Sequence, residues 1–244
     1  MSRVRVPPGP PELIFSSALW QSFCYYEDYI MRIVFKEKEQ KAETIYSFTF
    51  LSKEDVRWIA GQAIRLEIET LWLTEERYFT ISSAPYEKKI TITTEVSDSD
   101  FKQALHALKS GDEIDAFAIS GDHVWQNKPS IFVAGGMGIT PYIAILKQLH
   151  YEGVKPEAIK LLYSAKEQKI VFKKELLKLE KELDNLSLEL LHGQRIDEEK
   201  VLDAAKSIND PIIYISGPSK MVDSLGAKFE DKSYLLKRDW FTGL

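Results

Sequence analysis

One stretch of the chain, residues 131–141 (IFVAGGMGITP), constrains the fold more than any other. Its apolar start, 131–134, contains two β-branched residues and is typical of a strand buried on both faces. The turn that follows contains Gly135, Gly136 and Gly138. Glycine allows positive φ angles and close approach of a ligand to the backbone. Thr140 suits a helix N-cap and Pro141 the first helical position.

A helix that starts beside a loop without side chains is an anion site, because its first amides lack partners within the helix. The stretch 131–141 therefore predicts phosphate binding. The alternative is a strand-to-helix turn that uses glycine only for packing.

Strands and helices alternate from about residue 127 to the end of the chain. The expected strands are 131–134, 158–163, 186–191, 211–215 and 234–237, and the expected helices are 142–150, 171–183, 197–206 and 219–225. This alternation predicts an α/β domain with a doubly wound parallel sheet. An apolar stripe on the second helix is expected to face the core and to carry no chemistry, and it consists of Phe172, Leu176, Leu179 and Leu183.

The preceding part of the chain has a different rhythm, with short strands and one helix, 101–108. The expected strands are 32–35, 44–50, 63–68, 77–83, 89–96 and 113–119. This pattern predicts an antiparallel β-barrel. We therefore expect two domains, 31–126 and 127–244. The proline-rich residues 1–30 are expected to be a leader, either disordered or upstream of a true start at Met31, rather than a signal peptide.

Composition excludes several classes of function. A net charge of −5 gives no electrostatic case for nucleic acid or for an anionic membrane surface. The single cysteine, Cys24, excludes a disulfide framework, a cysteine-ligated zinc site and a self-contained iron–sulfur cluster. The four histidines are scattered, so no metal site is expected, and no transmembrane segment is evident. We expect a cytoplasmic, reducing location.

Chemistry-bearing residues follow two further strands of the α/β half. Ser164 and Lys166 could meet a ribose 2′-phosphate, although a solvated loop lysine is an equal alternative for Lys166. No acidic residue stands directly after this strand to bind an unphosphorylated 2′-hydroxyl, which favours NADPH over NADH. The stretch Ser216-Gly217-Pro218 follows another strand.

In the barrel half, residues 77–83 (RYFTISS) combine a fixed cation, two aromatic rings and three hydroxyls on one strand. Arginine can bind phosphate through a fork, aromatic side chains can cover a flat ring, and hydroxyls can bond ring heteroatoms. The alternative is an amphipathic strand with a surface arginine.

Three motifs in order give the chain its resemblance to the ferredoxin–NADP reductase superfamily of flavin oxidoreductases. The Arg-x-Tyr-Ser/Thr-x-x-Ser motif stands at 77–83, and Gly-Gly-x-Gly-Ile-Thr-Pro is complete at 135–141. Cys-Gly-Pro-x-x-Met is represented by Ser216-Gly217-Pro218-Ser219-Lys220-Met221. The resemblance covers residues 31–244.

The resemblance implies a role for each matched position. For the flavin, Arg77 would hold a phosphate, Phe79 would pack on the isoalloxazine, Thr80 would lie near N5, Ser82 and Ser83 would line the site, and Lys102 would stand at a phosphate-contacting position. For the nicotinamide nucleotide, the pyrophosphate would be bound by Gly135, Gly136, Gly138, Ile139, Thr140 and Pro141, and the nicotinamide would be bordered by Ser216, Gly217 and Pro218. Thr80 and Ser216 are the candidate catalytic residues.

Some positions depart from the superfamily pattern. Phe79 replaces the usual tyrosine, Ser216 replaces the usual cysteine, and Leu244 stands where many relatives end in an aromatic residue. The loop 118–121 lacks the usual Gly-Pro pair.

The resemblance implies a flavin-dependent NAD(P)H oxidoreductase that passes hydride from nicotinamide to flavin N5 and electrons on to an acceptor. The flavin would be FAD, with FMN as the alternative. The acceptor stays open between a ferredoxin, a flavodoxin, a haem protein and a small molecule. The alternative function is a non-catalytic electron-transfer or assembly subunit that retains the reductase fold.

Overall fold

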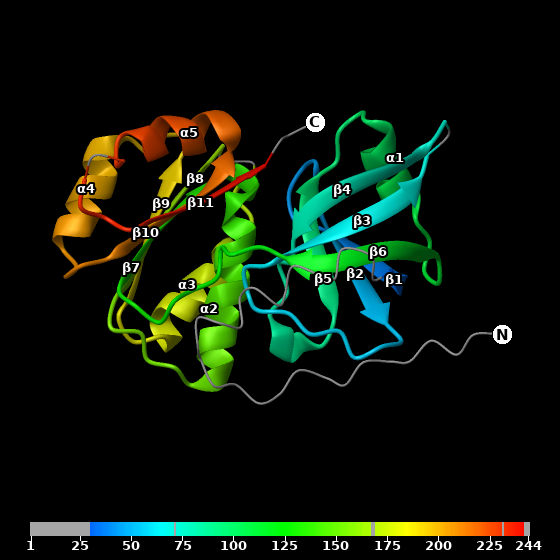
Figure 1. The fold of residues 1–244 in the computed structure, drawn as a ribbon, viewed down its shortest axis with the longest axis horizontal. Coiled ribbons are helices and arrows are strands. Elements are labelled where there is room, and N and C mark those ends of the chain that lie inside the picture. Colours follow the sequence, from blue (N-terminus) through cyan, green and yellow to red (C-terminus); the bar gives the residue numbers. More distant parts are fainter. Residues whose placement is uncertain (1–29, 71, 167–168, 231, 242–244) are drawn as a thin grey trace.

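A computed structural model describes residues 30–70, 72–166, 169–230 and 232–241. They form a six-stranded antiparallel sheet followed by a five-stranded parallel sheet with helices (Figure 1). The predicted leader, residues 1–30, lies outside these residues except for Ile30. The predicted domain boundary near Asn127 falls between the last strand of the first sheet and the first strand of the second. It stays a prediction.

The first sheet curls into a nearly closed barrel with strand order β4-β3-β6-β1-β2-β5. Its strands are β1 (Met31–Gln40), β2 (Ile45–Ser52), β3 (Ala63–Glu69), β4 (Thr74–Thr80), β5 (Ile90–Glu95) and β6 (Glu113–Ser120). A bridge between Ile81 and Ile92 brings the two end strands together. Helix α1 (Asp100–Ala107) buries Phe101 and Leu105 fully in the barrel core. The predicted barrel is therefore confirmed, and its edges are protected by near closure.

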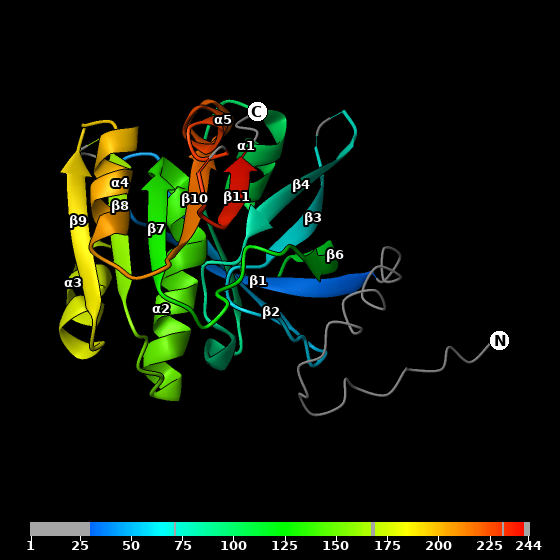
Figure 2. The ribbon, with the colours of Figure 1, turned by 60° about the vertical axis from the view of Figure 1, so that its left-hand side comes forward.

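The second sheet is parallel and has the order β11-β10-β7-β8-β9, and Figure 2 shows its strands side by side from β9 to β11. Its strands are β7 (Ser130–Gly135), β8 (Ile159–Ala165), β9 (Leu186–His192), β10 (Ile212–Pro218) and β11 (Leu236–Phe241). Its helices are α2 (Thr140–Glu152), α3 (Lys173–Glu182), α4 (Glu198–Lys206) and α5 (Ser219–Ala227). Strand β7 is buried along its whole length, as its apolar sequence predicts.

The helices cover both faces of this sheet, so the predicted doubly wound architecture is confirmed. One buried cluster joins a sheet face to α2 and α3, and another joins the opposite face to α4 and α5. The predicted apolar stripe lies in the first cluster, with Leu176 fully buried. Figure 1 shows α2 between the parallel sheet and the barrel.

The strand order creates a switch point between β7 and β10. The chain runs outward from β7 through β8 to β9, then returns to the other side of β7 with β10. Ligands of doubly wound sheets bind in the crevice at the carboxyl ends of strands at such a point. Among the described residues, no helix has both the length and the apolar character needed to cross a membrane.

Neighbouring leucines on α3 provide a test of this packing. We expect Leu176→Ala to lower the free energy of unfolding by about 2–5 kcal/mol, because Leu176 is fully buried. The neighbouring Leu177 is 39% exposed, so Leu177→Ala should change it by only about 0.5 kcal/mol. Urea denaturation followed by circular dichroism measures both variants. Equal losses would contradict the assigned orientation of α3.

Candidate functional site

At the switch point, the backbone at the end of β7 and in turn η4 (Gly136–Ile139) packs closely against the backbone at the end of β10. A Cβ on Gly138 would lie 2.0 Å from the carbonyl oxygen of Ser216, so only glycine fits there. Gly217 has a φ of 154°, and its added Cβ would lie 3.0 Å from the Gly135 carbonyl oxygen. A Cβ on Gly135 would meet the Met221 sulfur at 2.4 Å. The ends of β7 and β10 therefore pack together without intervening side chains.

Gly136 has a different role from its two neighbouring glycines. It adopts a φ of 54°, and an added Cβ would meet nothing within 4 Å. Of the three glycines in this turn, only Gly136 is among the positive-φ residues. Two glycines in this turn thus serve close packing, and Gly136 presents bare backbone to open space.

The sequence predicts Thr140 as the helix N-cap, and this prediction is wrong. The 3-10 turn η4 (Gly136–Ile139) runs directly into α2, which already includes Thr140 as a helical residue. The Thr140 hydroxyl donates to the Met137 carbonyl oxygen at 2.9 Å and is buried. Pro141 lies in the first turn of α2, as predicted. The Thr140 hydroxyl therefore closes the turn η4.

Ser216 is fully buried at the end of β10. Its hydroxyl donates to the Asp239 carboxylate at 3.1 Å, across the register pair that β10 and β11 form at this position. Burial raises the pKa of Asp239, while the Ser216 hydrogen bond opposes this shift. Sequence reasoning assigned Asp239 no role.

Ser164 and Lys166 lie beside the switch point, at the end of β8. Ser164 pairs in register with Gly135, and its hydroxyl donates to the Gln194 carbonyl oxygen. Lys166 is exposed. Its neighbour Glu167 lies outside the described residues. The structure thus brings the predicted 2′-phosphate residues to the carboxyl ends of the parallel strands, where the glycine-rich turn also lies.

The predicted flavin residues of the barrel gather around Phe79. This ring is buried and stacks on Phe101 with centroids 5.8 Å apart. The Lys102 ammonium lies 4.5 Å from the Phe79 ring centroid and donates to the Thr94 hydroxyl. Arg77 lies over Phe101, with its Cζ 5.6 Å from the ring centroid. Two cations therefore flank a pair of stacked rings.

Lys102 lacks an ion-pair partner within the described parts of the chain. Burial and the nearby Arg77 charge lower the pKa of Lys102 to about 8, and Glu95 opposes this shift. Arg77 is oriented by Glu75, at 2.6 Å, and by the Glu76 carbonyl oxygen, at 3.0 Å. A partly buried cation beside a second cation is costly unless an anion compensates it. The arrangement therefore fits a phosphate-bearing group.

Thr80, Ser82 and Ser83 are all buried. The Ser82 hydroxyl donates to the Thr91 carbonyl oxygen at 3.0 Å. The Ser83 hydroxyl donates to the Lys89 carbonyl oxygen at 2.7 Å and accepts the Thr91 N–H at 2.9 Å. Both serine hydroxyls therefore fasten the end of the Arg77–Ser83 motif to β5.

The parallel-sheet half meets the barrel at β5, and we call this zone of contact the seam. Turn η4 contacts β5. Lys169, after β8, also pairs with Glu95 at the end of β5. Within the described residues, no group of three or more His, Cys, Asp or Glu side chains is arranged to hold a metal ion.

Comparison with known proteins agrees with this geometry. Residues 132–226 match the oxidoreductase NAD-binding domain family. A flavohemoprotein of Halalkalibacterium halodurans is 32% identical over 52% of this chain and 34% of its own length. Flavohemoprotein A of Dictyostelium discoideum is 26% identical over 81% of this chain and 57% of its own. Ferredoxin-NADP+ reductase from Plasmodium falciparum superposes with a TM-score of 0.75 and 16% identity, covering 89% of this chain and 98% of that one.

The fold of the chain is that of ferredoxin-NADP+ reductase, with a match to an oxidoreductase NAD-binding domain over residues 132–226. The chain spans only about a third to somewhat over half of the lengths of the two flavohemoproteins it matches. Of the departures from the superfamily pattern, Phe79 keeps its ring in the barrel cluster and Ser216 bonds Asp239. Leu244 lies outside the described residues.

The different surroundings of Gly138 and Gly136 predict that alanine substitutions at these two positions lower stability by different amounts. We expect Gly138→Ala to lower the free energy of unfolding by about 3 kcal/mol or more, because its Cβ would meet the Ser216 backbone. Gly136→Ala should cost only about 1–2 kcal/mol, the strain of a left-handed alanine in open space. Thermal denaturation followed by circular dichroism compares them. The backbone contact would be refuted by a Gly138→Ala protein as stable as Gly136→Ala.

Proposed function

We propose that this chain is a flavin-dependent NAD(P)H oxidoreductase that passes electrons from a nicotinamide nucleotide to an acceptor. The proposal rests on the different chemistry of the barrel and of the parallel-sheet half. In the barrel, Lys102 is a cation without an ion-pair partner among the described residues, and it lies beside stacked rings. In the parallel-sheet half, Gly136 presents backbone without a side chain. A cation beside rings suits a phosphate-bearing flavin, and bare backbone at a helix start suits a pyrophosphate.

Each candidate residue has a role in this proposal. Arg77 and Lys102 hold flavin phosphate, and Phe79 and Thr80 border the ring system. The turn that contains Gly135, Gly136, Gly138, Ile139, Thr140 and Pro141 holds the nucleotide pyrophosphate. Ser216, with Gly217 and Pro218, borders the nicotinamide, and Asp239 fixes the direction of the Ser216 hydroxyl. Ser82 and Ser83 support the site indirectly, because their hydroxyls hydrogen-bond the end of the motif to β5 and the residue before it.

A bound flavin supplies the hydride-accepting atom and passes electrons on one or two at a time. The protein contributes positioning and electrostatics, and no side chain needs to act as an acid or a base. We propose FAD as the flavin. The flavohemoprotein relatives favour a haem protein as the acceptor, with the haem on a part or partner beyond this chain. The cytoplasmic location stays a prediction.

Lys166 supports NADPH as the donor. It is exposed beside Ser164, at the edge where the second ribose of a dinucleotide would lie. We expect NADPH to bleach the flavin absorbance bands at lower concentration than NADH when the purified protein is titrated without oxygen. Lys166→Glu should raise KM for NADPH about tenfold or more and leave that for NADH within about twofold, because a charge-assisted contact is lost.

Three results would contradict the proposal at different levels. A bound flavin that neither nucleotide reduces would overturn the oxidoreductase, and a colourless protein that cannot be reconstituted would support the non-catalytic subunit. An unchanged KM for NADPH in Lys166→Glu would overturn only the 2′-phosphate assignment.

Lys102 makes flavin binding dependent on pH. Its pKa of about 8 means that the charge is present at pH 7 and largely lost at pH 9 in the flavin-free protein. A bound phosphate favours the protonated amine, so we expect the flavin Kd to rise about tenfold from pH 7 to pH 9. Lys102→Met should weaken binding at pH 7 and remove this pH dependence. Lys109→Met, at an exposed lysine after α1, is the matched control. Fluorescence titration of flavin measures all three proteins, and an equal pH dependence in Lys102→Met would exclude the assignment.

A further inference from the structure

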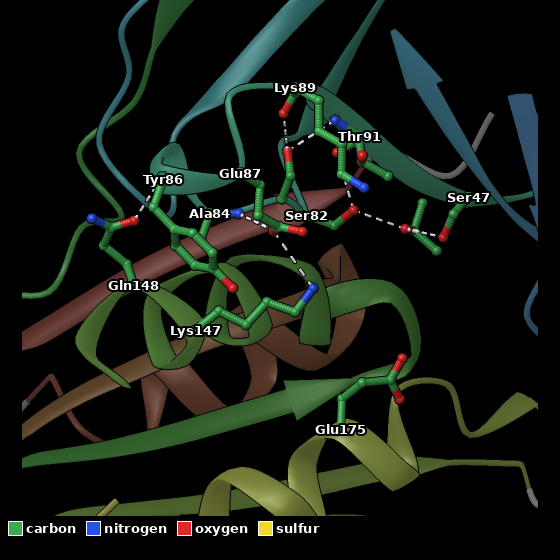
Figure 3. A network of polar contacts seen from close by, with 12 residues as sticks. Ser47, Ser82, Ala84, Tyr86, Glu87, Lys89, Thr91, Lys147, Gln148 and Glu175 are labelled. Carbon is green, nitrogen blue, oxygen red and sulfur yellow. Dashed lines mark hydrogen bonds and ion pairs between the residues drawn. The ribbon is translucent and has the colours of Figure 1, made fainter. Parts of the chain in front are cut away.

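The second half of α2 contacts the barrel at a short 3-10 turn, η3 (Pro85–Glu87). The Tyr86 backbone N–H donates to Gln148 Oε1 at 3.1 Å. The Tyr86 ring stacks on Tyr151 with centroids 4.3 Å apart and planes 8° apart. Figure 3 shows Gln148 and Lys147 reaching from α2 to this turn. These residues form what we call the η3–α2 junction: Tyr86, Glu87, Lys147, Gln148 and Tyr151.

The junction is ordered from both sides. The Glu87 carboxylate accepts the Ala84 N–H at 2.7 Å and lies 3.6 Å from the Lys147 ammonium. The Gln148 side chain donates through Nε2 to the Glu152 carboxylate at 2.6 Å. That bond fixes the amide so that its oxygen faces Tyr86. The contact thus has one defined geometry rather than several equivalent ones.

The junction links two elements that continue directly from the two predicted binding elements. Turn η3 follows directly after the Arg77–Ser83 motif, whose last residue is fastened to β5. Helix α2 begins directly after the glycine-rich turn η4. A shift at Tyr86 or Gln148 would therefore move one binding element relative to the other.

Apolar packing supports the same seam. Ile45 and Ala60, both from the barrel half, belong to the buried cluster that contains Ile143 and Leu146 of α2. This cluster holds the two halves together, but apolar contacts are not directional. The hydrogen bond and the ring stack of the junction are directional, so they select one orientation of α2 against the barrel.

We propose that Gln148 and Tyr151 are positioning residues that set the separation between the flavin-binding edge of the barrel and the glycine-rich turn. The inference rests on the proposed hydride transfer. From Gln148 to the start of α2 the helix extends about 12 Å, so a tilt of about 5° moves the turn by about 1 Å. A misplacement of about 1 Å can lower a reaction rate about 100-fold.

The first test measures the rate of flavin reduction after rapid anaerobic mixing with saturating NADPH. We expect the double variant Gln148→Ala/Tyr151→Ala to reduce its flavin at least about tenfold more slowly, with flavin content and nucleotide Kd within about twofold of the wild type. Tyr151 is 65% exposed and Gln148 is partly exposed, so the variant should still fold. Tyr151→Phe is the matched control, because stacking needs the ring alone, and it should keep the wild-type rate.

The second test does not depend on turnover. In a Cys24→Ser background, spin labels on Lys36→Cys, in β1, and Asp223→Cys, in α5, report the separation of the two halves by pulsed electron resonance. Both positions are exposed. We expect one narrow distance distribution in the parent protein and a shifted or broadened one in the double variant. Tyr151→Phe should leave the distribution unchanged.

The two tests separate failure of this inference from failure of the proposed function. A parent protein whose flavin neither nucleotide reduces would refute the hydride transfer, while the spin-label distances would still report on the junction. Unchanged distances in the double variant would overturn the positioning role, whatever the rate. A rate within about twofold of the wild type in a flavin-loaded double variant would overturn it as well.

Discussion

The close approach of two backbones at the switch point is the constraint on which the rest of the candidate site depends. Gly138 lies against the Ser216 carbonyl with no room for a Cβ, and Gly217 lies tightly against the Gly135 backbone. This packing holds the ends of β7 and β10 together, turns η4 outward and directs α2 toward the barrel. A parallel sheet buried on both faces supplies the rigidity that such contacts require.

Electrostatics defines the other side of the seam. Lys102 is desolvated beside Arg77 and the stacked rings of Phe79 and Phe101. The fold tolerates this cost because α1 anchors the cluster through residues buried in the barrel core. Destabilised charge held in place by a well-packed core is characteristic of binding sites, where a ligand supplies the missing partner. Together with the bare backbone opposite, it explains why the function proposed here joins a flavin to a nucleotide.

Much of the fold could be predicted from local pattern. The apolar run 131–134 and the stripe that contains Leu176 indicated the correct elements, because a strand covered on both faces is apolar throughout and a helix packed on one face repeats its apolar residues about every 3.6 positions. The candidate site was less predictable. Thr140 has the chemistry of an N-cap, but tertiary contacts extend the helix by a 3-10 turn, and its hydroxyl closes that turn instead. The serines of the barrel motif suggested ligand contacts, yet Ser82 and Ser83 bond β5.

By itself, the sequence determined the identity of the elements, their order and the positions at which glycine, cation and hydroxyl occur. These follow from side-chain chemistry and from periodicity along the chain, which act over a few residues. Only the tertiary structure decided which glycines pack and which one faces open space, that Ser216 bonds Asp239, and that Tyr86 meets Gln148. The bonded residues of these two pairs are separated by 23 and 62 positions. Their contacts depend on how β11 pairs with β10 and how α2 docks on the barrel, which no local pattern encodes.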